Sequence, residues 1–389
     1  MPAMSRVLLV DTNFSSAPIY DYLLRQGHEV LVVGGNPRDA LARSARNYVN
    51  LDYSDIDRTR ELVRTQNIDY LVPGCNDVSY RVCAKLNEDL RYPGIDTSEV
   101  TETLNNKKLF REFALAHSLP VPRLIAPEQL ISHWPVIIKP VDAYSGRGVT
   151  VLRESQSSLL AAALQQAREY SRTRTCIVEE YVEGQLYSHS AFISEQEIVW
   201  DVIVEEHGTV HPFAVDTSRV AHDFPDRLYQ AVRDSVISLS RSLQLVDGIV
   251  HTQFIASSNA ISLIEITRRC PGDLYSKLIQ STTGIDYAEN YTRPFLGQKF
   301  RFDPVHDTPS WIMRHTISSA EELILNGFRF HIPLQIENLV PIRQTGDRVK
   351  AAPLDRIAIL FARTDSQDEL EEIFSRTIER RLYSIVQDA

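Results

Sequence analysis

Cysteine is scarce in this sequence, and its scarcity excludes two kinds of stabilised domain. The four cysteines among 389 residues are Cys75, Cys83, Cys176 and Cys270, and no two of them form a Cys-x-x-Cys pair. A disulfide framework needs an even set of paired cysteines, and a structural zinc site needs clustered ligands. We therefore expect four reduced thiols that serve mainly as small core residues.

Long apolar runs and an excess of positive charge are also missing. No stretch approaches the roughly 18 apolar residues of a membrane-spanning helix. Residues 1–6 lack the hydrophobic region of a signal peptide. The formal net charge of −10 argues against a protein that binds nucleic acid or anionic membranes. These absences predict a cytoplasmic protein that acts on small molecules, with neither nucleic acid nor membrane as a partner.

Glycine is absent from the first turn of an otherwise Rossmann-like pattern. Residues 6–95 alternate between strand and helix, which predicts a parallel sheet with helices on both faces. A dinucleotide pyrophosphate needs glycines in the first turn for close backbone approach. Residues 11–16 supply none, so we exclude an NAD site. Asp11, Asn13 and residues 74–77 either face a substrate or are ordinary turn and cap residues.

The rest of the chain mixes helices with antiparallel strands. We expect helices at residues 98–117, 156–170, 226–245 and 368–385, and strands within 186–215 and at 248–255, 261–266, 311–316 and 357–362. The last 90 or so residues are expected to form a small α+β piece.

Residues 135–149 combine a buried strand, a lysine and a small-residue loop. The apolar residues 136–138 lead to Lys139, and a loop with Ser145, Gly146, Arg147 and Gly148 follows. Backbone N–H groups of such a loop can enclose a polyphosphate while the lysine supplies a positive charge. The alternative interpretation is a hairpin with a glycine turn and a surface lysine.

A second pattern lies on the strand pair near residue 260. Gln253 and Glu265 are separated so that a hairpin can set them side by side, and the period of two puts Thr267 and Arg269 on the face of Glu265. Oxygen ligands suit Mg²⁺, and an arginine suits phosphate or carboxylate. The alternative is a solvated sheet face with a surface ion pair.

Four motifs in this order resemble the ATP-grasp superfamily over about residues 1–300. The quoted segments are Asn106-Lys107 with Arg111, residues 139–149, residues 178–184, and residues 250–254 with 264–269. The sequence separation between Gln253 and Glu265 is most similar to that of the carbamoyl-phosphate-synthetase branch. His251-Thr252 and Pro271-Gly272-Asp273 look more like dipeptide-forming amino-acid ligases.

The resemblance implies a fold of mixed α/β and α+β class. It comprises a half-Rossmann pre-ATP-grasp domain at residues 1–97 and an ATP-grasp domain at 98–300, whose ATP-binding subdomain spans about 123–185. A small C-terminal α+β extension follows at 301–389.

The resemblance also implies ligands and residue roles. The ligands are ATP and Mg²⁺, with Mn²⁺ as an alternative ion. Catalytic roles fall to Arg269, Lys139 and Arg268, with Arg268 on a substrate carboxylate and Asp273 on its ammonium group. The residues implied to bind the nucleotide are Lys107, Lys139, Ser145, Gly146, Arg147, Gly148, Glu179, Glu180, Tyr181 and Val182, with Glu179 receiving the adenine amino group. The implied metal ligands are Gln253, Glu265 and Thr267.

Two positions depart from the family pattern. Thr267 replaces the usual asparagine and is a poorer Mg²⁺ ligand, so one metal would be held through water or lost. Leu186 stands where many members carry a ribose-binding glutamate; Glu183 or Gln185 would then hold the ribose, or it is held loosely.

The implied activity is ATP-dependent joining of a carboxylate to an amine through an acyl phosphate. The substrate would be a small amino acid or related acid, and a homodimer is a family-level expectation. A bicarbonate-using carboxylase and a nucleotide-binding protein without turnover are the alternatives. Residues 216–223 form a polar loop in which Arg219 could bind a carboxylate and His222 could assist amine deprotonation.

Overall fold

Four parallel strands form the N-terminal sheet, as the alternating pattern predicts. The computed structural model describes residues 5–126, 133–143, 146–304 and 310–386. The sheet order is β3-β2-β1-β4, with every neighbouring pair parallel. Its strands are β1 (Arg6–Val10), β2 (Glu29–Gly34), β3 (Asn47–Asn50) and β4 (Tyr70–Pro73), and its helices are α1 (Ala17–Arg25), α2 (Ala40–Ser44), α3 (Ile56–Thr65) and α4 (Asp77–Leu90). The short edge strand β3 has asparagine at both ends and no buried residue, so its sequence carried no apolar strand signal.

The basic segment 98–117 is two helices rather than the single predicted helix. They are α5 (Ser98–Asn105) and α6 (Lys107–Ala116), separated at Asn106. The Asn106 backbone is extended, and its side chain accepts hydrogen bonds from the N–H groups of Lys108 and Leu109. This N-cap begins α6 at Lys107 and thereby fixes the position of that lysine.

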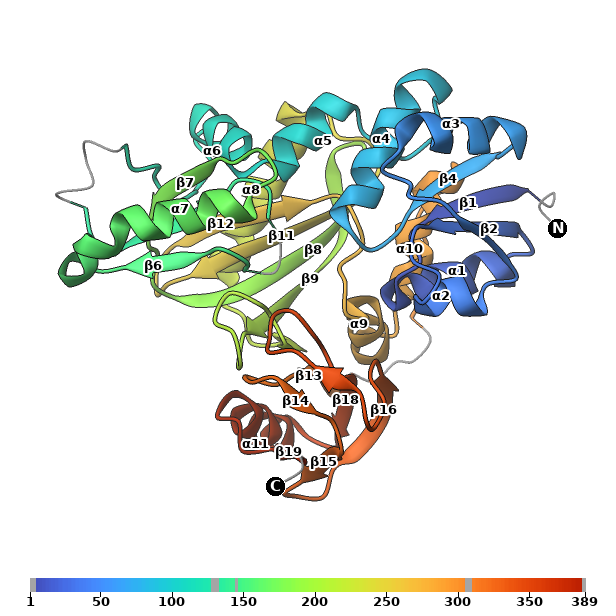
Figure 1. The fold of residues 1–389 in the computed structure, drawn as a ribbon. Coiled ribbons are helices and arrows are strands. Elements are labelled where there is room, and N and C mark those ends of the chain that lie inside the picture. The colour runs from blue at the N-terminus through green and yellow to red at the C-terminus, as the bar shows by residue number, and fades with distance from the viewer. Residues whose placement is uncertain (1–4, 127–132, 144–145, 305–309, 387–389) are drawn as a thin grey trace.

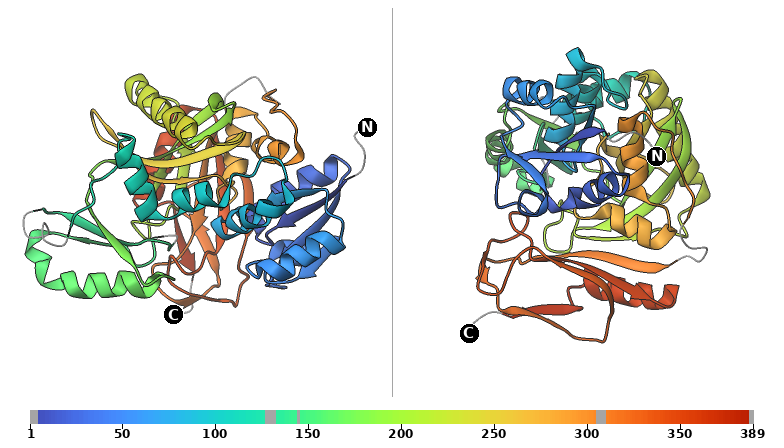
Figure 2. Two further views of the ribbon diagram at one scale, coloured as in Figure 1. Left: turned by 90° about the horizontal axis from the view of Figure 1, so that it is seen from above. Right: turned by 90° about the vertical axis from the view of Figure 1, so that its right-hand side faces the viewer.

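A separate three-stranded antiparallel sheet contains Lys139. Its order is β6-β5-β7, made of β5 (Val136–Pro140), β6 (Thr150–Leu152) and β7 (Cys176–Glu180). The helix α7 (Leu160–Tyr170) packs on it through Ala163 and Ala167. Figure 1 and the left view of Figure 2 show this green sheet and the blue N-terminal sheet at opposite ends of the molecule.

An eight-stranded antiparallel sheet lies between those two ends. Its order is β12-β11-β8-β9-β10-β13-β18-β16. The strands are β8 (Gln185–Ser194), β9 (Glu197–His207), β10 (Thr217–Val220), β11 (Gly248–Ala256), β12 (Ile261–Thr267), β13 (Trp311–Ile317), β16 (Gln335–Pro341) and β18 (Ala358–Thr364). In the chain, α8 (Asp226–Ser242) lies between β10 and β11, and α9 (Tyr275–Thr283) and α10 (Tyr287–Thr292) lie between β12 and β13. β8, β9, β11, β12, β13 and β18 lie in the predicted strand regions.

The C-terminal residues extend this sheet rather than forming a separate one. β10 pairs with β13, which brings three strands from beyond residue 301 into the same sheet. These residues still have their own apolar core, around Ile317, Leu360 and Phe374. They form the lower orange and red layer in the right view of Figure 2.

The end of the chain differs from the predicted helix 368–385. The helix α11 (Gln367–Ile378) stops earlier, and Arg380 then adopts a left-handed conformation with φ of 58°. The strand β19 (Tyr383–Val386) follows and pairs with β15 (Gly327–Phe330). β14 (Leu323–Ile324) and β17 (Arg348–Val349) form a further two-stranded antiparallel sheet. Within the described ranges, no helix is both long and apolar enough to cross a membrane.

Buried His315 is expected to make the protein less stable in mild acid. Its ring nitrogens contact the Thr217 hydroxyl and the Tyr383 hydroxyl, each at 2.8 Å, and burial lowers the pKa of His315 below its ordinary value. The unfolded chain therefore takes up a proton below about pH 6.5 that the folded chain resists, at about 1.4 kcal/mol per pH unit. We expect His315→Gln to lose less stability than the wild type between pH 6.5 and 5 in urea unfolding. Exposed His331→Gln is the control, and equal slopes for wild type and His315→Gln would contradict the assignment.

Candidate active site

A cavity of about 780 Å³ is lined by residues from the N-terminal sheet region, the β5–β7 sheet and the eight-stranded sheet. The β5–β7 sheet contributes Lys139, and the β11–β12 hairpin contributes Gln253, Glu265, Thr267 and Arg269. The N-terminal domain lines it with Asp11, Asn13, Cys75, Asn76 and Asp77, the turn residues that the sequence left as substrate candidates. The C-terminal extension adds Arg314 and Arg356.

The hairpin sets Gln253 directly opposite Glu265, as the sequence predicts. Directly opposed residues of antiparallel strands project to the same face of the sheet. From the turn, the pairing runs in register up to Phe254 with Leu263. Continued regularly, it would pair Gln253 with Ile264. A β-bulge at Ile264 instead brings Glu265 into register.

The donors on this hairpin suit Mg²⁺ better than a transition metal. Among the residues that the structure describes, no group of three or more His, Cys, Asp or Glu residues could hold a metal. Mg²⁺ needs no such cage, because it keeps water and binds one or two protein oxygens plus substrate phosphates. The Gln253 amide and the Glu265 carboxylate, which is 38% exposed, supply two oxygen donors facing the cavity.

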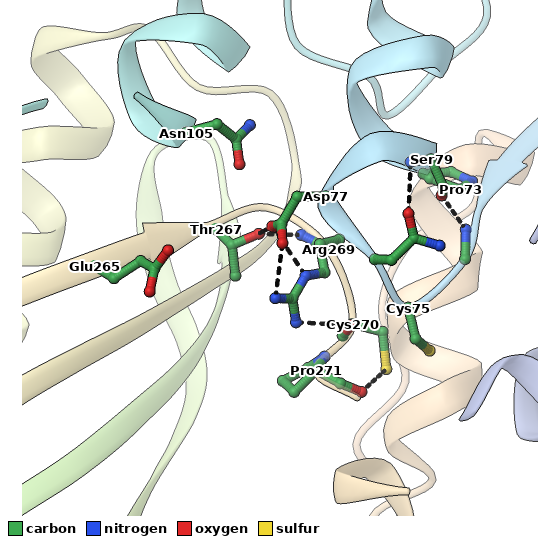
Figure 3. A network of polar contacts seen from close by, with 12 residues as sticks. Pro73, Cys75, Asp77, Ser79, Asn105, Glu265, Thr267, Arg269, Cys270 and Pro271 are labelled. Carbon is green, nitrogen blue, oxygen red and sulfur yellow. Dashed lines mark hydrogen bonds and ion pairs between the residues drawn. The ribbon is translucent and has the colours of Figure 1, made fainter. Parts of the chain in front are cut away.

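Asp77 joins the N-terminal domain to the hairpin (Figure 3). Its carboxylate accepts hydrogen bonds from Arg269 Nε and Nη2, at 3.0 and 3.1 Å, and from the Thr267 hydroxyl at 3.0 Å. Burial acts to raise the pKa of the Asp77 carboxyl, but the adjacent Arg269 guanidinium outweighs burial and holds that pKa below its ordinary value. An ionised Asp77 therefore anchors Arg269.

The same network changes the interpretation of Thr267. Its hydroxyl donates to Asp77 and accepts a hydrogen bond from the Arg269 backbone N–H at 3.4 Å. The prediction that Thr267 is a metal ligand is not supported by this arrangement, because its only side-chain oxygen already has two protein partners.

Two lysines from outside the hairpin also line the cavity. Lys107 Nζ donates to the Ala143 carbonyl at 3.0 Å and lies 3.4 Å from Glu265 Oε1. Lys139 Nζ donates to Glu179 Oε2 at 2.7 Å and also lines the cavity. Together with Arg269, the two lysines put three cationic side chains around one cavity, and this arrangement suits a triphosphate.

The end of β7 and the segment after it line the adjacent wall with Glu180, Tyr181 and Val182. The backbone N–H of Glu180 donates to the Arg123 carbonyl, and that of Tyr181 donates to the Pro135 carbonyl. Among the described residues, the Val182 N–H has no such partner. This N–H is therefore available to a ligand in the cavity.

Glu179 does not have the predicted role. Its side chain is fully buried between two cations, with Arg111 Nε 2.6 Å from Oε1 and Lys139 Nζ 2.7 Å from Oε2. Burial acts to raise the pKa of Glu179, but Lys139 and Arg111 hold it below its ordinary value. Both oxygens of this carboxylate are therefore occupied, so it is not placed to receive an adenine amino group and instead fixes Lys139 and Arg111.

Arg111 itself should matter for stability. It is fully buried, and its Nη2 donates to the carbonyl of the bulged residue Ile264 at 2.8 Å. Removing one partner of a buried ion pair leaves a desolvated charge. We expect Arg111→Met to lower the free energy of unfolding by about 3 kcal/mol, measured by urea denaturation. Arg123→Met, which removes an exposed partner of Glu180, should cost no more than about 1 kcal/mol. Equal losses in the two variants would contradict this role.

Arg268 also differs from the prediction. It is 4% exposed and does not line the cavity. Its Nε donates to Asp96 at 2.6 Å, and its Nη2 donates to the Val246 carbonyl at 2.5 Å. Because side chains alternate along a strand, Arg268 projects away from the face of Thr267 and Arg269. It ties the N-terminal domain to the sheet and is not placed to bind a substrate carboxylate.

The glycine-rich loop is described only in part. Ser145 lies outside the described residues. Arg147 is exposed to solvent and does not line the cavity. Gly146 lines the cavity with φ of +69°, and a Cβ on it would lie 2.5 Å from the Phe213 carbonyl oxygen. Only glycine allows this close approach between the loop and residues 211–214.

The polar loop candidates lie elsewhere. Arg219 binds Glu205 and Glu371 and covers the Phe374 ring, and His222 packs against Trp311. Neither lines the cavity. Asp273 does line it, but its carboxylate is paired with Arg356.

The lining residues that the sequence reasoning missed include Glu206, Arg314 and Arg356. Arg314 is 2% exposed and lies 4.0 Å from the carboxylate of Asp273. No motif marked these positions. The one available signal was the alternation of β9, which puts Glu206 on the same face as Val204 and Val202, a face that is otherwise apolar.

Residues 132–277 match the family model of the ATP-grasp domain. Among curated proteins, phosphoribosylamine–glycine ligase of Pyrococcus furiosus is 21% identical over 297 residues. That match covers 68% of this chain and 66% of the relative, slightly less than two thirds of the relative's length.

Two solved structures show the same fold over nearly the whole chain. An L-amino acid ligase from Bacillus licheniformis superposes with a TM-score of 0.79 at 14% identity, covering 99% of each chain. The biotin carboxylase domain of 2-oxoglutarate carboxylase from Hydrogenobacter thermophilus, solved with MgADP and bicarbonate, has a TM-score of 0.75 at 14% identity and covers 98% of this chain and 91% of that one. The expected fold is confirmed.

Proposed function

From the ATP-grasp domain that this chain carries, we propose that it is an ATP-dependent ligase joining a carboxylate to an amine. The carboxylate would attack the γ-phosphorus of ATP, and the amine would then displace phosphate from the resulting acyl phosphate. ADP and phosphate would be released with the amide. The observation that carries the proposal is the convergence of Lys107, Lys139, Gln253, Glu265 and Arg269 on one cavity.

Each part of this set has a role that its chemistry suits. Lys107 and Lys139 would hold the phosphates, and the Val182 N–H would bind the adenine edge. Gln253 and Glu265 would hold Mg²⁺, which supplies charge neutralisation on the phosphate oxygens when bound. Arg269 would bind the transferred phosphoryl group, since a guanidinium matches phosphate in two-pronged geometry.

The acid and amine would bind at the end of the cavity lined by the C-terminal extension. Arg314 and Arg356 are suited to a substrate carboxylate, and Asp273, which now pairs with Arg356, would exchange that partner for the substrate's ammonium group. This paired set of charges supports a small amino acid or a related acid as substrate. The phosphoribosylamine–glycine ligase and the L-amino acid ligase are named for activities of the same broad class.

The test is product analysis without a chosen substrate. The protein is incubated with ATP, Mg²⁺ and pooled amino acids and sugar acids, and ADP and new masses are followed. We expect ADP release that depends on an amine, together with a mass corresponding to acid plus amine minus water. Bicarbonate-dependent ADP release without an amino acid would instead indicate a carboxylase. Nucleotide binding with no ADP release across the pool would argue against a ligase.

A further inference from the structure

A row of polar side chains crosses six adjacent strands of the eight-stranded sheet. The strands are β12, β11, β8, β9, β10 and β13. Each contributes one member, in the order Glu265, Gln253, Ser188, Glu206, Ser218 and Arg314. The row therefore runs from the proposed metal hairpin to the C-terminal arginine.

Glu206 holds a central position in this row. Its Oε2 accepts a hydrogen bond from Gln253 Nε2, and its Oε1 accepts one from the Ser188 hydroxyl, both at 2.9 Å. Ser188 lies directly opposite Gln253 on the neighbouring strand. Glu206 is only 3% exposed, so solvent cannot easily take over these two hydrogen bonds.

The contact with Glu206 decides which end of the Gln253 amide faces the metal side. A glutamine amide has one end that donates hydrogen bonds and one that accepts them, and the two have almost the same shape. Only the oxygen end suits Mg²⁺. Glu206 binds the nitrogen end, which directs Oε1 of Gln253 away from Glu206.

We propose that Glu206 is a positioning residue that orients the Gln253 amide so that its oxygen is presented to the metal. This inference rests on the proposed function, because it uses Gln253 as a metal ligand. Both Glu206 oxygens already accept protein hydrogen bonds, so Glu206 acts through Gln253 rather than by binding the ion itself. Outer partners of this kind typically change metal affinity about 10- to 100-fold when removed.

The test measures Mn²⁺ binding in the presence of ADP, by the electron paramagnetic resonance signal of free Mn²⁺, and needs no turnover. Glu206→Met removes the acceptor while keeping an unbranched side chain of similar length. We expect it to weaken Mn²⁺ binding at least about 10-fold. Glu206→Gln keeps an acceptor oxygen in the same place and should weaken binding no more than about 3-fold. Equal losses in both variants would mean that the charge matters, and would overturn the positioning role.

A matched control and a second variant test the same point independently. Glu205→Gln changes the neighbouring glutamate, which binds Arg219 instead of the hairpin, and should leave Mn²⁺ affinity unchanged. Gln253→Met should weaken binding as Glu206→Met does, and the double variant should be no weaker than Gln253→Met alone, because the two residues act as one unit. If Glu206→Met does not fold, Glu206→Leu replaces it with the same expected loss of at least about 10-fold.

The outcomes separate this inference from the proposed function. A wild-type protein that binds no Mn²⁺ with ADP would overturn both. Normal wild-type binding with Glu206→Met within two-fold of it, or additive losses in the double variant, would overturn the positioning role alone.

Discussion

Arg269→Ala is expected to lower kcat/KM at least about 10³-fold, which corresponds to about 4 kcal/mol of transition-state stabilisation. Arg269 is the cavity guanidinium next to the hairpin glutamate, and its present partner is the Asp77 carboxylate. Negative charge grows on the transferred phosphoryl group, and a preorganised arginine offsets that charge without reorganisation. Steady-state ADP release with the substrates found by product analysis is the measurement.

The Arg269 series distinguishes charge from geometry. Arg269→Lys keeps the positive charge but loses the planar fork that binds two oxygens at once. We expect it to recover no more than about 10-fold of the lost activity. ADP affinity should change little in either variant. Arg25→Ala, which removes an exposed arginine paired with Asp286, is the matched control. An Arg269→Ala enzyme with more than a tenth of wild-type activity would remove Arg269 from the reaction centre.

Glu265→Gln should lose about 10²- to 10³-fold in turnover, because it replaces the only carboxylate of the hairpin's proposed metal pair. The same change removes the ion partner that lies 3.4 Å from Lys107. Since glutamine keeps the size of the side chain, the fold should be preserved. Thermal unfolding and ADP release at several Mg²⁺ concentrations are the measurements.

The dependence on metal makes this second prediction specific. Loss of a metal ligand should raise the Mg²⁺ concentration needed for half-maximal activity at least about 10-fold, whereas a general loss of folding would not. Glu197→Gln, at an exposed glutamate that binds Arg241, is the matched control and should leave both values unchanged. If Glu265→Gln lost activity with an unaltered Mg²⁺ requirement, the carboxylate would have another role.

Local pattern was enough to locate most elements and most of the cavity. Parallel strands alternating with helices, the strand before Lys139 and the hairpin with Gln253 and Glu265 all follow from short-range apolar periodicity. The alternation along β12 had already put Thr267 and Arg269 on one face. Arg268 had nevertheless been given a role on a substrate carboxylate, and the structure instead pairs it with Asp96.

Elements without an apolar signal were harder to predict. The break at Asn106 depends on a cap hydrogen bond that interrupts an otherwise helical stretch. The edge strand β3 has only Tyr48 and Val49 as apolar residues, neither fully buried, and its place in the sheet comes from pairing with β2. Likewise, nothing local to residues 311–317 or 358–364 says that their strands continue the main sheet through β10.

What the sequence determined by itself is therefore the set of chemical groups and the face of the strand on which each lies. The tertiary structure alone decided which groups are free to act. Glu179 is buried against Arg111 and Lys139, the Thr267 hydroxyl is held by Asp77, and a single bulged residue puts Glu265 opposite Gln253. The physical reason is that side-chain direction follows from local backbone periodicity, whereas the partner of a charge depends on segments far away in the chain.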